Sequence, residues 1–330
     1  MITVTLYTRK DCSPCEQVKA DLESLQSEIP HTLALVDVDE DPDLQVAYGE
    51  RVPVLQVGPY TVEAPMDRAK ISMTLAAARD RMQQTKGDPK LAARRERGAS
   101  FSSADRIIHW FSRHFMMVLN LFIFLYVALP FMAPVFMNAG VPALARPIYS
   151  VYGALCHQMA FRSWFLFGDQ VAYPRASAGV EGYVTYGEAT GLDEDDLLEA
   201  RRFIGNEEVG YKVAYCERDI AIYGAMFLFG LLFVASGRRI PPLPWYWWVI
   251  IGILPIGIDG FSQLLSQIPG WPFWDYREST PLLRTLTGAL FGFSTAWFGF
   301  PLIEESMAET RVNFAAKKAR LDAKARAEDH

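Results

Sequence analysis

Residues 2–15 read ITVTLYTRKDCSPC, which places two cysteines shortly after a run rich in apolar and β-branched residues. Such a run is typical of a strand, and we expect a helix to begin at the second cysteine. Amide groups at a helix N-terminus, together with a nearby cation such as Lys10, stabilise a thiolate. We therefore expect Cys12 to be a nucleophilic thiol and Cys15 to be its resolving partner.

The residues that follow predict alternating strands and helices. We expect strands at 2–7, 32–38, 52–57 and 60–64 and helices at 15–27, 42–48 and 67–82. A β-α-β order closed by a hairpin predicts a thioredoxin-like α/β sheet, here over residues 1–85. In that arrangement a proline before the third strand lies beside the dithiol, and Pro53 stands at that place.

Three short runs give this segment a family resemblance. TLYTRKDCSPC at 5–15, VDVD at 36–39 and VPV at 52–54 together resemble a glutaredoxin-like domain. The resemblance implies a thioredoxin fold, a cis bond before Pro53 and thiol–disulfide exchange at Cys12 and Cys15. Where glutaredoxins commonly carry a Gly-Gly-x-Asp stretch for glutathione, this chain has APMD at 64–67, so glutathione is not the expected reductant. The alternatives are a docking module with an inactive cysteine pair or half of a metal site.

The second part of the 330-residue chain is strongly apolar. Four runs, at 115–137, 220–236, 245–265 and 282–300, approach the roughly 20 residues that cross a bilayer as a helix. We expect an α-helical transmembrane bundle of about four spans within a membrane domain at 115–304. The overall net charge of −6 gives no reason to expect a nucleic-acid partner.

Basic residues set the expected orientation. They occur in a linker or surface helix at 86–114, in the Arg238-Arg239 pair and in a tail at 305–330. Short segments rich in Lys and Arg stay in the cytoplasm, so we expect both termini there, in the inner membrane. The linker residues expected to approach anionic lipid headgroups are Lys90, Arg94, Arg95, Arg97, Arg106 and Arg113.

The same orientation predicts that residues 138–219 lie outside. Within them, 141–168 is apolar yet carries Arg146, His157 and Arg162, and we expect a re-entrant or interfacial helix there. Residues 169–214 are acidic and predict a folded external cap.

Short polar motifs interrupt the membrane domain. They are CHQ at 156–158, FRS at 161–163, CERD at 216–219, DGFSQ at 259–263 and RTLTG at 284–288. In this order they resemble a bacterial polytopic membrane-protein family that is a domain of unknown function. The resemblance supplies positions and an expected fold but no activity.

Helix geometry adds an expectation about Asp259. Asp259 and Gln263 are four residues apart and share a helix face, so both can point into the bundle. A charge in the membrane needs a partner, and we expect Arg218 or Arg284 to pair with Asp259 beneath an external polar pocket. His157, Arg162 and Asp219 are the remaining candidates for its lining.

Cys156 and Cys216 admit three interpretations. External placement favours a structural disulfide. A zinc or copper site would use Cys156, His157, Cys216 and Asp219, and a transient catalytic disulfide is the third possibility. We assign no metal or other cofactor from these residues.

The sequence predicts a membrane-anchored thiol–disulfide oxidoreductase that uses the cytoplasmic Cys12–Cys15 dithiol. Its expected partners are membrane lipids and a cytoplasmic thiol or disulfide protein. One alternative is a non-enzymatic protein that handles a metal or small ligand in the external pocket. Another is an accessory subunit of a membrane complex. Reduction of a quinone is a further alternative, but no span carries the C-x-x-C of vitamin K epoxide reductase relatives.

Overall fold

The computed structural model describes residues 2–84, 98 and 100–328, and these divide into two compact units. The first unit contains the N-terminal residues through His114 and the C-terminal residues from Glu305, and the second contains Phe115–Glu304. Part of the expected basic linker, including Lys90, Arg94, Arg95 and Arg97, lies outside the described residues.

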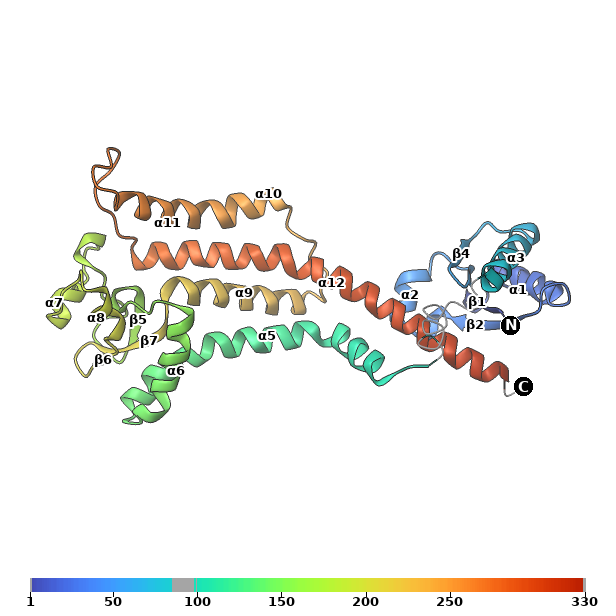
Figure 1. Ribbon diagram of the computed structural model, residues 1–330, viewed down its shortest axis with the longest axis horizontal. Coiled ribbons are helices and arrows are strands. Elements are labelled where there is room, and N and C mark those ends of the chain that lie inside the picture. Colours follow the sequence, from blue (N-terminus) through green and yellow to red (C-terminus); the bar gives the residue numbers. More distant parts are fainter. Residues whose placement is uncertain (1, 85–97, 99, 329–330) are drawn as a thin grey trace. The chain divides into compact units, whose positions relative to one another are not determined.

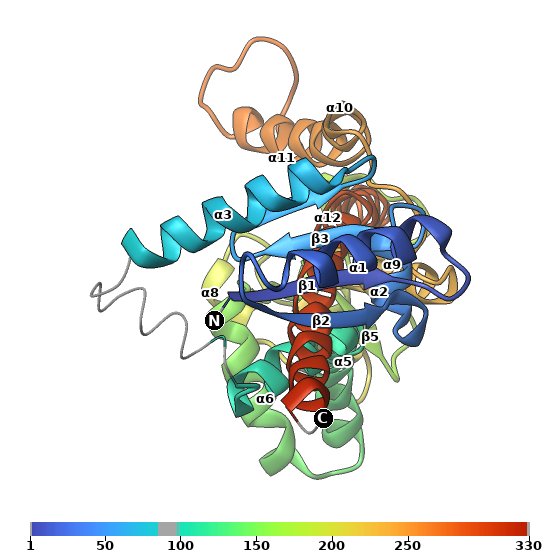
Figure 2. The same cartoon turned by 90° about the vertical axis from the view of Figure 1, so that its right-hand side faces the viewer.

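The N-terminal part of the first unit has a thioredoxin-like fold. Its elements are β1 (Ile2–Thr8), α1 (Ser13–Leu25), β2 (His31–Asp37), α2 (Pro42–Tyr48), β3 (Val54–Val57), β4 (Tyr60–Glu63) and α3 (Arg68–Gln84). The strand order is β2-β1-β3-β4. β1 pairs parallel to β2, as the α1 crossover requires, and antiparallel to β3. Figure 2 shows β3, β1 and β2 side by side in this order.

Side chains alternate along β1, so apolar residues point to both faces of the sheet. Each face packs against a separate hydrophobic cluster. Val4 and Leu6 face α1 and α3, where Leu22 and Leu75 complete the core. Tyr7 faces the other way, into a cluster that includes Leu44 of α2 and Ala316 of α12 (Pro281–Glu328). Each fully buried Leu contributes roughly 1.5–3 kcal/mol, so the two clusters hold the short sheet together.

Four helices among the described residues are long and apolar enough to cross a membrane. They are α5 (Ser103–Asn138), α9 (Glu217–Ala235), the continuous segment Trp245–Ser266 and α12. The third comprises α10 (Trp245–Trp247), a π-helical turn at Trp248–Ile253 and α11 (Leu254–Ser266). Figure 1 shows the four helices running alongside one another. These helices contain the four predicted apolar runs, which confirms the predicted α-helical membrane bundle.

The expected interfacial helix at 141–168 is only partly helical. α6 (Pro142–Leu155) has 14 residues, so at about 1.5 Å rise per residue it falls short of the ~30 Å hydrocarbon core. A short 3₁₀ turn, Ala160–Arg162, and β5 (Ser163–Leu166) follow. The backbone becomes extended at Cys156, where α6 ends, and again at Ser163, where the 3₁₀ turn ends.

Residues 169–214 fold as a small α+β element. β7 (Gly210–Cys216) lies between β5 and the two-residue strand β6 (Gly205–Asn206). Thr185 and Glu188 form a capping box on α7 (Tyr186–Thr190), and Asp196 caps α8 (Leu197–Arg202). The acidic run at 192–199 therefore contains a helix cap, as its composition predicts, but β7 comes from the alternating residues after it.

Candidate functional site

The dithiol lies where β1 gives way to α1. Cys12 is the N-cap residue of α1 and is partly exposed, whereas Cys15 lies in the first turn and is buried. The two form a disulfide with their Cα atoms 5.2 Å apart. The backbone N–H groups of Cys15 and Glu16 donate to the Cys12 carbonyl at 3.0 and 3.1 Å, which fixes the loop at the helix start.

Pro53 stands at the same edge of the sheet. It directly precedes β3, follows a cis peptide bond, and is next to Val54, which pairs with Tyr7 near the carboxyl end of β1. The loop that carries Cys12 leaves from that end. The expected cis bond before Pro53 is present. Lys10 is exposed in the turn before Cys12.

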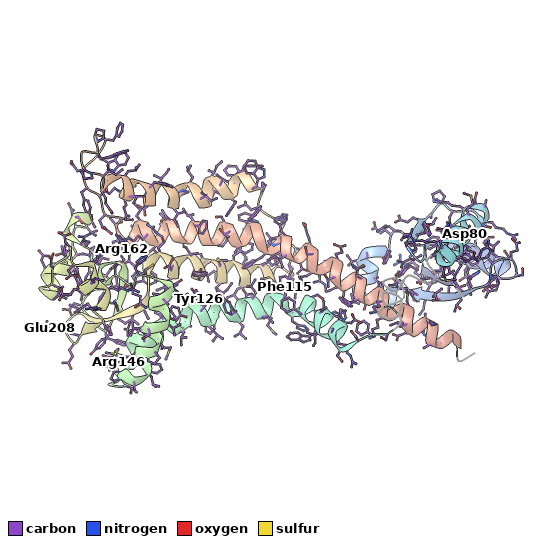
Figure 3. The ribbon with its side chains drawn as sticks, viewed as in Figure 1. Asp80, Phe115, Tyr126, Arg146, Arg162 and Glu208 are labelled. Atoms are coloured by element: carbon purple, nitrogen blue, oxygen red, sulfur yellow. A yellow bond between two sulfur atoms is a disulfide. The ribbon has the colours of Figure 1, made fainter. Side chains whose placement is uncertain are left out.

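A second candidate site opens at one end of the membrane unit. Figure 3 shows Arg162 at that end and Phe115 at the other. A pocket of about 230 Å³ is lined mainly by polar side chains there. Of the residues predicted for a polar cluster, those that line it are Cys156, His157, Arg162, Cys216, Arg218, Asp219, Gln263 and Arg284.

Strand pairing brings the two cysteine motifs together. In the β5–β7 pair, Ser163 of the FRS motif is opposite Cys216. The side-chain amide of Gln158 donates to the carbonyls of Tyr149, at 3.0 Å, and Ala214, which ties the CHQ loop to both α6 and β7. Cys156 follows the last residue of α6, and Cys216 immediately precedes α9.

The sulfur atoms of Cys156 and Cys216 and a carboxylate oxygen of Asp219 all lie within 4.8 Å of one another. The Cys216 thiol donates to Asp219 Oδ2 at 2.8 Å. Both cysteines are free thiols, so the structure does not contain the disulfide expected from their external placement. His157 lines the pocket as an exposed side chain and is not part of this three-residue group.

The two thiols differ in acidity. The interaction between the two thiol groups lowers the pKa of Cys156 and raises that of Cys216. Burial raises the pKa of Cys216 further, and the backbone N–H of Gln158 favours the Cys156 thiolate. Cys156 is therefore the first of the pair to ionise.

Two buried carboxylates hold the arginines around this pocket. Asp259 pairs with Arg218 and Arg277, and the hydroxyl of Ser279 donates to it at 2.8 Å. The expected ion pair between Asp259 and an arginine is therefore present through Arg218. Arg284 does not reach Asp259, because it pairs with Glu278 and lies 3.7 Å from Glu217.

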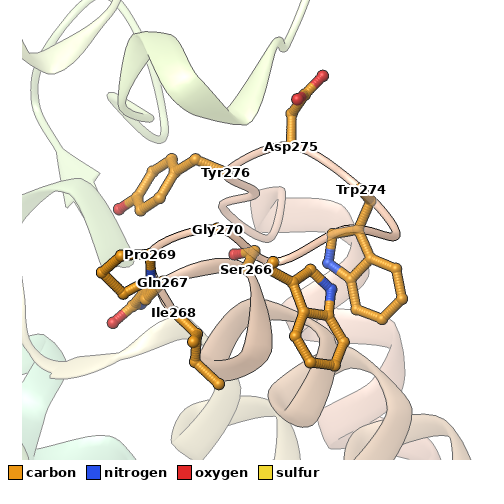
Figure 4. A pocket seen from close by; sticks show the side chains of 9 residues that line it. Ser266, Gln267, Ile268, Pro269, Gly270, Trp274, Asp275 and Tyr276 are labelled. Carbon is orange, nitrogen blue, oxygen red and sulfur yellow. The ribbon is translucent and has the colours of Figure 1, made fainter.

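Glu278 also accepts an ion pair from Arg162 at 2.8 Å. Sequence reasoning missed Arg277 and Glu278, although three polar residues in a row, RES at 277–279, stand just before the last apolar run. These residues belong to the loop after α11. Figure 4 shows a hollow in the preceding part of that loop, of about 350 Å³, with Trp274 and Tyr276 on opposite sides.

Lys212 is a further buried charge that the sequence did not reveal. Its ammonium group donates to the carbonyls of Gln158 at 2.8 Å and Arg201 at 2.7 Å. The pKa of Lys212 is lowered to about 7, mainly by burial; the charge of Cys156 opposes the shift, and the charge of Arg201 adds to it. The alternating run VGYKVAYC at 209–216 was the available signal for its strand.

Fold and sites together define a membrane protein that carries a thioredoxin-like domain. Residues 3–78 match the family model described as a glutaredoxin-like domain (DUF836). Residues 203–298 match the one described as a predicted membrane protein (DUF2085), and the second match includes Cys216, Asp259 and Arg284. The chain is thus a fusion of these two kinds of domain, as the motifs predicted.

The chain is also similar to an uncharacterized protein of Methanocaldococcus jannaschii. The two are 24% identical over 200 residues, which cover 58% of this chain and 94% of that protein. No solved structure matches the chain.

Proposed function

We propose that this protein is a membrane-anchored thiol–disulfide oxidoreductase. The observation that carries the proposal is the Cys12–Cys15 pair at the start of α1, within a glutaredoxin-like domain. Cys12 is the more exposed of the two, and Cys15 is 1% exposed. This asymmetry supports attack by Cys12 and resolution by Cys15.

The proposed exchange begins with the reduced pair. The Cys12 thiolate attacks one sulfur of a substrate disulfide, so that a Cys12–substrate bond forms and the other substrate sulfur leaves as a thiolate. Cys15 then attacks Cys12 Sγ, releases the second substrate thiolate and forms the Cys12–Cys15 disulfide. Two electrons pass from the dithiol to the substrate. A second dithiol, from a protein rather than glutathione, restores the reduced pair.

The expected placement supports a cytoplasmic partner. Arg238 and Arg239 lie between α9 and the third span, and the basic tail forms the end of α12, after its apolar part. By the positive-inside rule both would be cytoplasmic, which puts the N-terminal dithiol in the same compartment in the inner membrane. The substrate would then be a cytoplasmic thiol or disulfide protein brought to the lipid surface.

The test combines activity with topology. The purified full-length protein should reduce a model protein disulfide when a dithiol reductant is supplied, and Cys12→Ser should abolish this exchange. Cys156→Ser is the matched control, because it removes a thiol of the other unit and should retain the activity.

A membrane-impermeant thiol reagent should label reduced Cys12 in inverted vesicles and not in right-side-out vesicles. Unchanged exchange in Cys12→Ser would refute the proposed chemistry, and labelling only in right-side-out vesicles would refute the placement.

The pocket of the membrane unit favours a second role, the handling of a small ligand. Its lining combines thiols, arginines and the amide of Gln263 around one pocket. Such convergent polar groups are typical of ligand sites. A role as accessory subunit of a membrane complex remains an expectation that co-purification would test.

A further inference from the structure

The thiols of Cys156 and Cys216 and the carboxylate of Asp219 converge from three places in the fold. Cys156 follows α6, Cys216 ends β7, and Asp219 lies in the first turn of α9. Because Cys216 and Asp219 are three residues apart at a helix start, they lie on one face. The β5–β7 pairing and the Gln158 hydrogen bonds hold Cys156 against them. This is a fixed arrangement of ligand atoms made by the tertiary structure.

The spacing of these atoms suits one metal ion. They lie within 4.8 Å of one another. Zinc–sulfur bonds of about 2.3 Å and zinc–oxygen bonds of about 2.0–2.2 Å allow separations of this size with small side-chain rotations. Two thiolates with one carboxylate suit a borderline cation such as Zn²⁺ better than the hard cations Mg²⁺ and Ca²⁺, which prefer oxygen alone.

The charges around the group accept a divalent cation. The three arginines that line the pocket each have an acidic partner: Arg162 and Arg284 pair with Glu278, and Arg218 pairs with Asp259. Glu278 is shared by two of these arginines, and Asp259 is shared with Arg277, so the positive charges are only partly compensated. When an ion binds, the thiol protons of Cys156 and Cys216 leave to solvent. The two thiolates and the Asp219 carboxylate then carry three negative charges against the two positive charges of the ion, and the remaining negative charge suits the partly compensated arginines. No existing ion pair has to break.

An unpartnered group points to a ligand beyond the protein. Gln263 is 9% exposed, lines the same pocket, and its Nε2 atom has no hydrogen-bond partner in the described structure. A buried amide without a partner costs about 1–3 kcal/mol. A water or anion bound at a fourth metal position would accept from this amide. Three protein ligands with an open position are the arrangement of reactive zinc sites rather than purely structural ones.

We propose that Cys156, Cys216 and Asp219 bind one divalent cation of the zinc class, with a fourth position open to the pocket. The site is independent of the Cys12–Cys15 dithiol, and it gives the membrane unit a ligand chemistry of its own. His157, next to Cys156, is not needed as a ligand.

Co²⁺ and Zn²⁺ are the probes. The full-length protein, purified in detergent, reduced and freed of metal by a chelator, should bind one Co²⁺ per chain. The complex should show thiolate-to-cobalt charge-transfer absorption and the visible bands of a tetrahedral ion, and Zn²⁺ should displace it. Cys156→Ser or Cys216→Ser should remove the charge-transfer band or halve it. Asp219→Asn should weaken binding by at least tenfold, and Cys12→Ser/Cys15→Ser should leave both spectrum and stoichiometry unchanged.

Wild-type protein provides a test that needs no variant. Bound Zn²⁺ should protect Cys156 and Cys216, but not Cys12 and Cys15, from alkylation, as read by mass spectrometry of the labelled peptides. The proposal is overturned if the reduced wild type binds no Co²⁺ or if Zn²⁺ leaves alkylation of Cys156 and Cys216 unchanged. It is equally overturned if the cobalt spectrum is lost in the Cys12→Ser/Cys15→Ser variant, which would locate the ion at the dithiol. The first two results would not bear on thiol exchange by Cys12, whereas the third would support the alternative of a metal site at the dithiol.

Discussion

Asp259 of α11 and Arg277 of the following loop form an ion pair at 2.9 Å. Asp259 is 3% exposed, and the same carboxylate also pairs with Arg218 and accepts from Ser279. One buried acid thereby joins three segments, the start of α9, α11 and the loop before α12. Any substitution that removes its charge leaves two arginines without their shared partner.

We expect Asp259→Asn to destabilise the membrane unit. Removing one partner of a buried ion pair costs about 3–5 kcal/mol, but Arg218 and Arg277 retain a quarter to a third of their exposure and can be hydrated. The free energy of unfolding should therefore fall by an amount at or below the lower end of this range, about 3 kcal/mol. Thermal unfolding in detergent measures it. Asp275→Asn, in the same loop, is the control and should change the midpoint little; equal midpoints for both variants would contradict the role given to Asp259.

Glycines on α12 should control how closely α9 approaches. A Cβ at Gly292 would collide with the carbonyl of Ile222, and one at Gly288 would lie 2.7 Å from the carbonyl oxygen of Arg218. Small residues permit such close approach in membrane helices. Gly292→Ala should cost about 1–3 kcal/mol through overpacking. Gly299→Ala is the matched control on the same helix, because a Cβ there meets nothing within 4 Å. Comparable losses in both variants would argue against the α9–α12 contact.

Lys212 should make stability depend on pH above neutrality. Its folded pKa of about 7 lies below the value of 10.5 expected when it is unfolded, so between these values the unfolded chain binds the extra proton. The free energy of unfolding should then rise from pH 7 toward pH 10, by at most about 1.4 kcal/mol per pH unit. Below pH 7 the lysine is charged in both the folded and the unfolded state, so its contribution to the free energy of unfolding no longer changes with pH.

The measurement compares unfolding midpoints over this pH range in the wild type and in Lys212→Met. The variant should lose the contribution of Lys212 to the slope, whereas Lys70→Met, at an exposed lysine in α3, should keep it. A Lys212→Met protein with the slope of the wild type would show that the lysine does not titrate in the folded state as expected.

Cys15→Ser should trap the exchange half-way. Without the resolving thiol, Cys12 forms a mixed disulfide with its substrate that persists until an external thiol attacks it. We expect covalent adducts on non-reducing gels of membranes that hold this variant, released by a reductant. Cys12→Ser/Cys15→Ser should yield none, and the appearance of the same adducts in that double variant would assign them to other cysteines.

Local patterns predicted much of the fold. The helix expected at 42–48 is α2 at the same residues, because Asp41 caps it and Pro42 starts it. The four apolar runs are helices, although α5 begins at Ser103, well before the apolar residues start, because a polar helical turn has no hydropathy signal. β5 and β7 were missed because their residues lie among apolar and acidic stretches that obscured the alternation.

The sequence by itself determined the class of protein: a thioredoxin-like domain with a dithiol at a helix start, joined to apolar helices with Asp259 and Gln263 on one face. These properties follow from periodicity and composition, which are local. Only the tertiary structure decided that Cys156 and Cys216 meet at Asp219 and that Arg284 turns to Glu278 rather than to Asp259. The physical reason is that strand pairing and the burial of charge select partners by distance in space, which spacing along the chain does not encode.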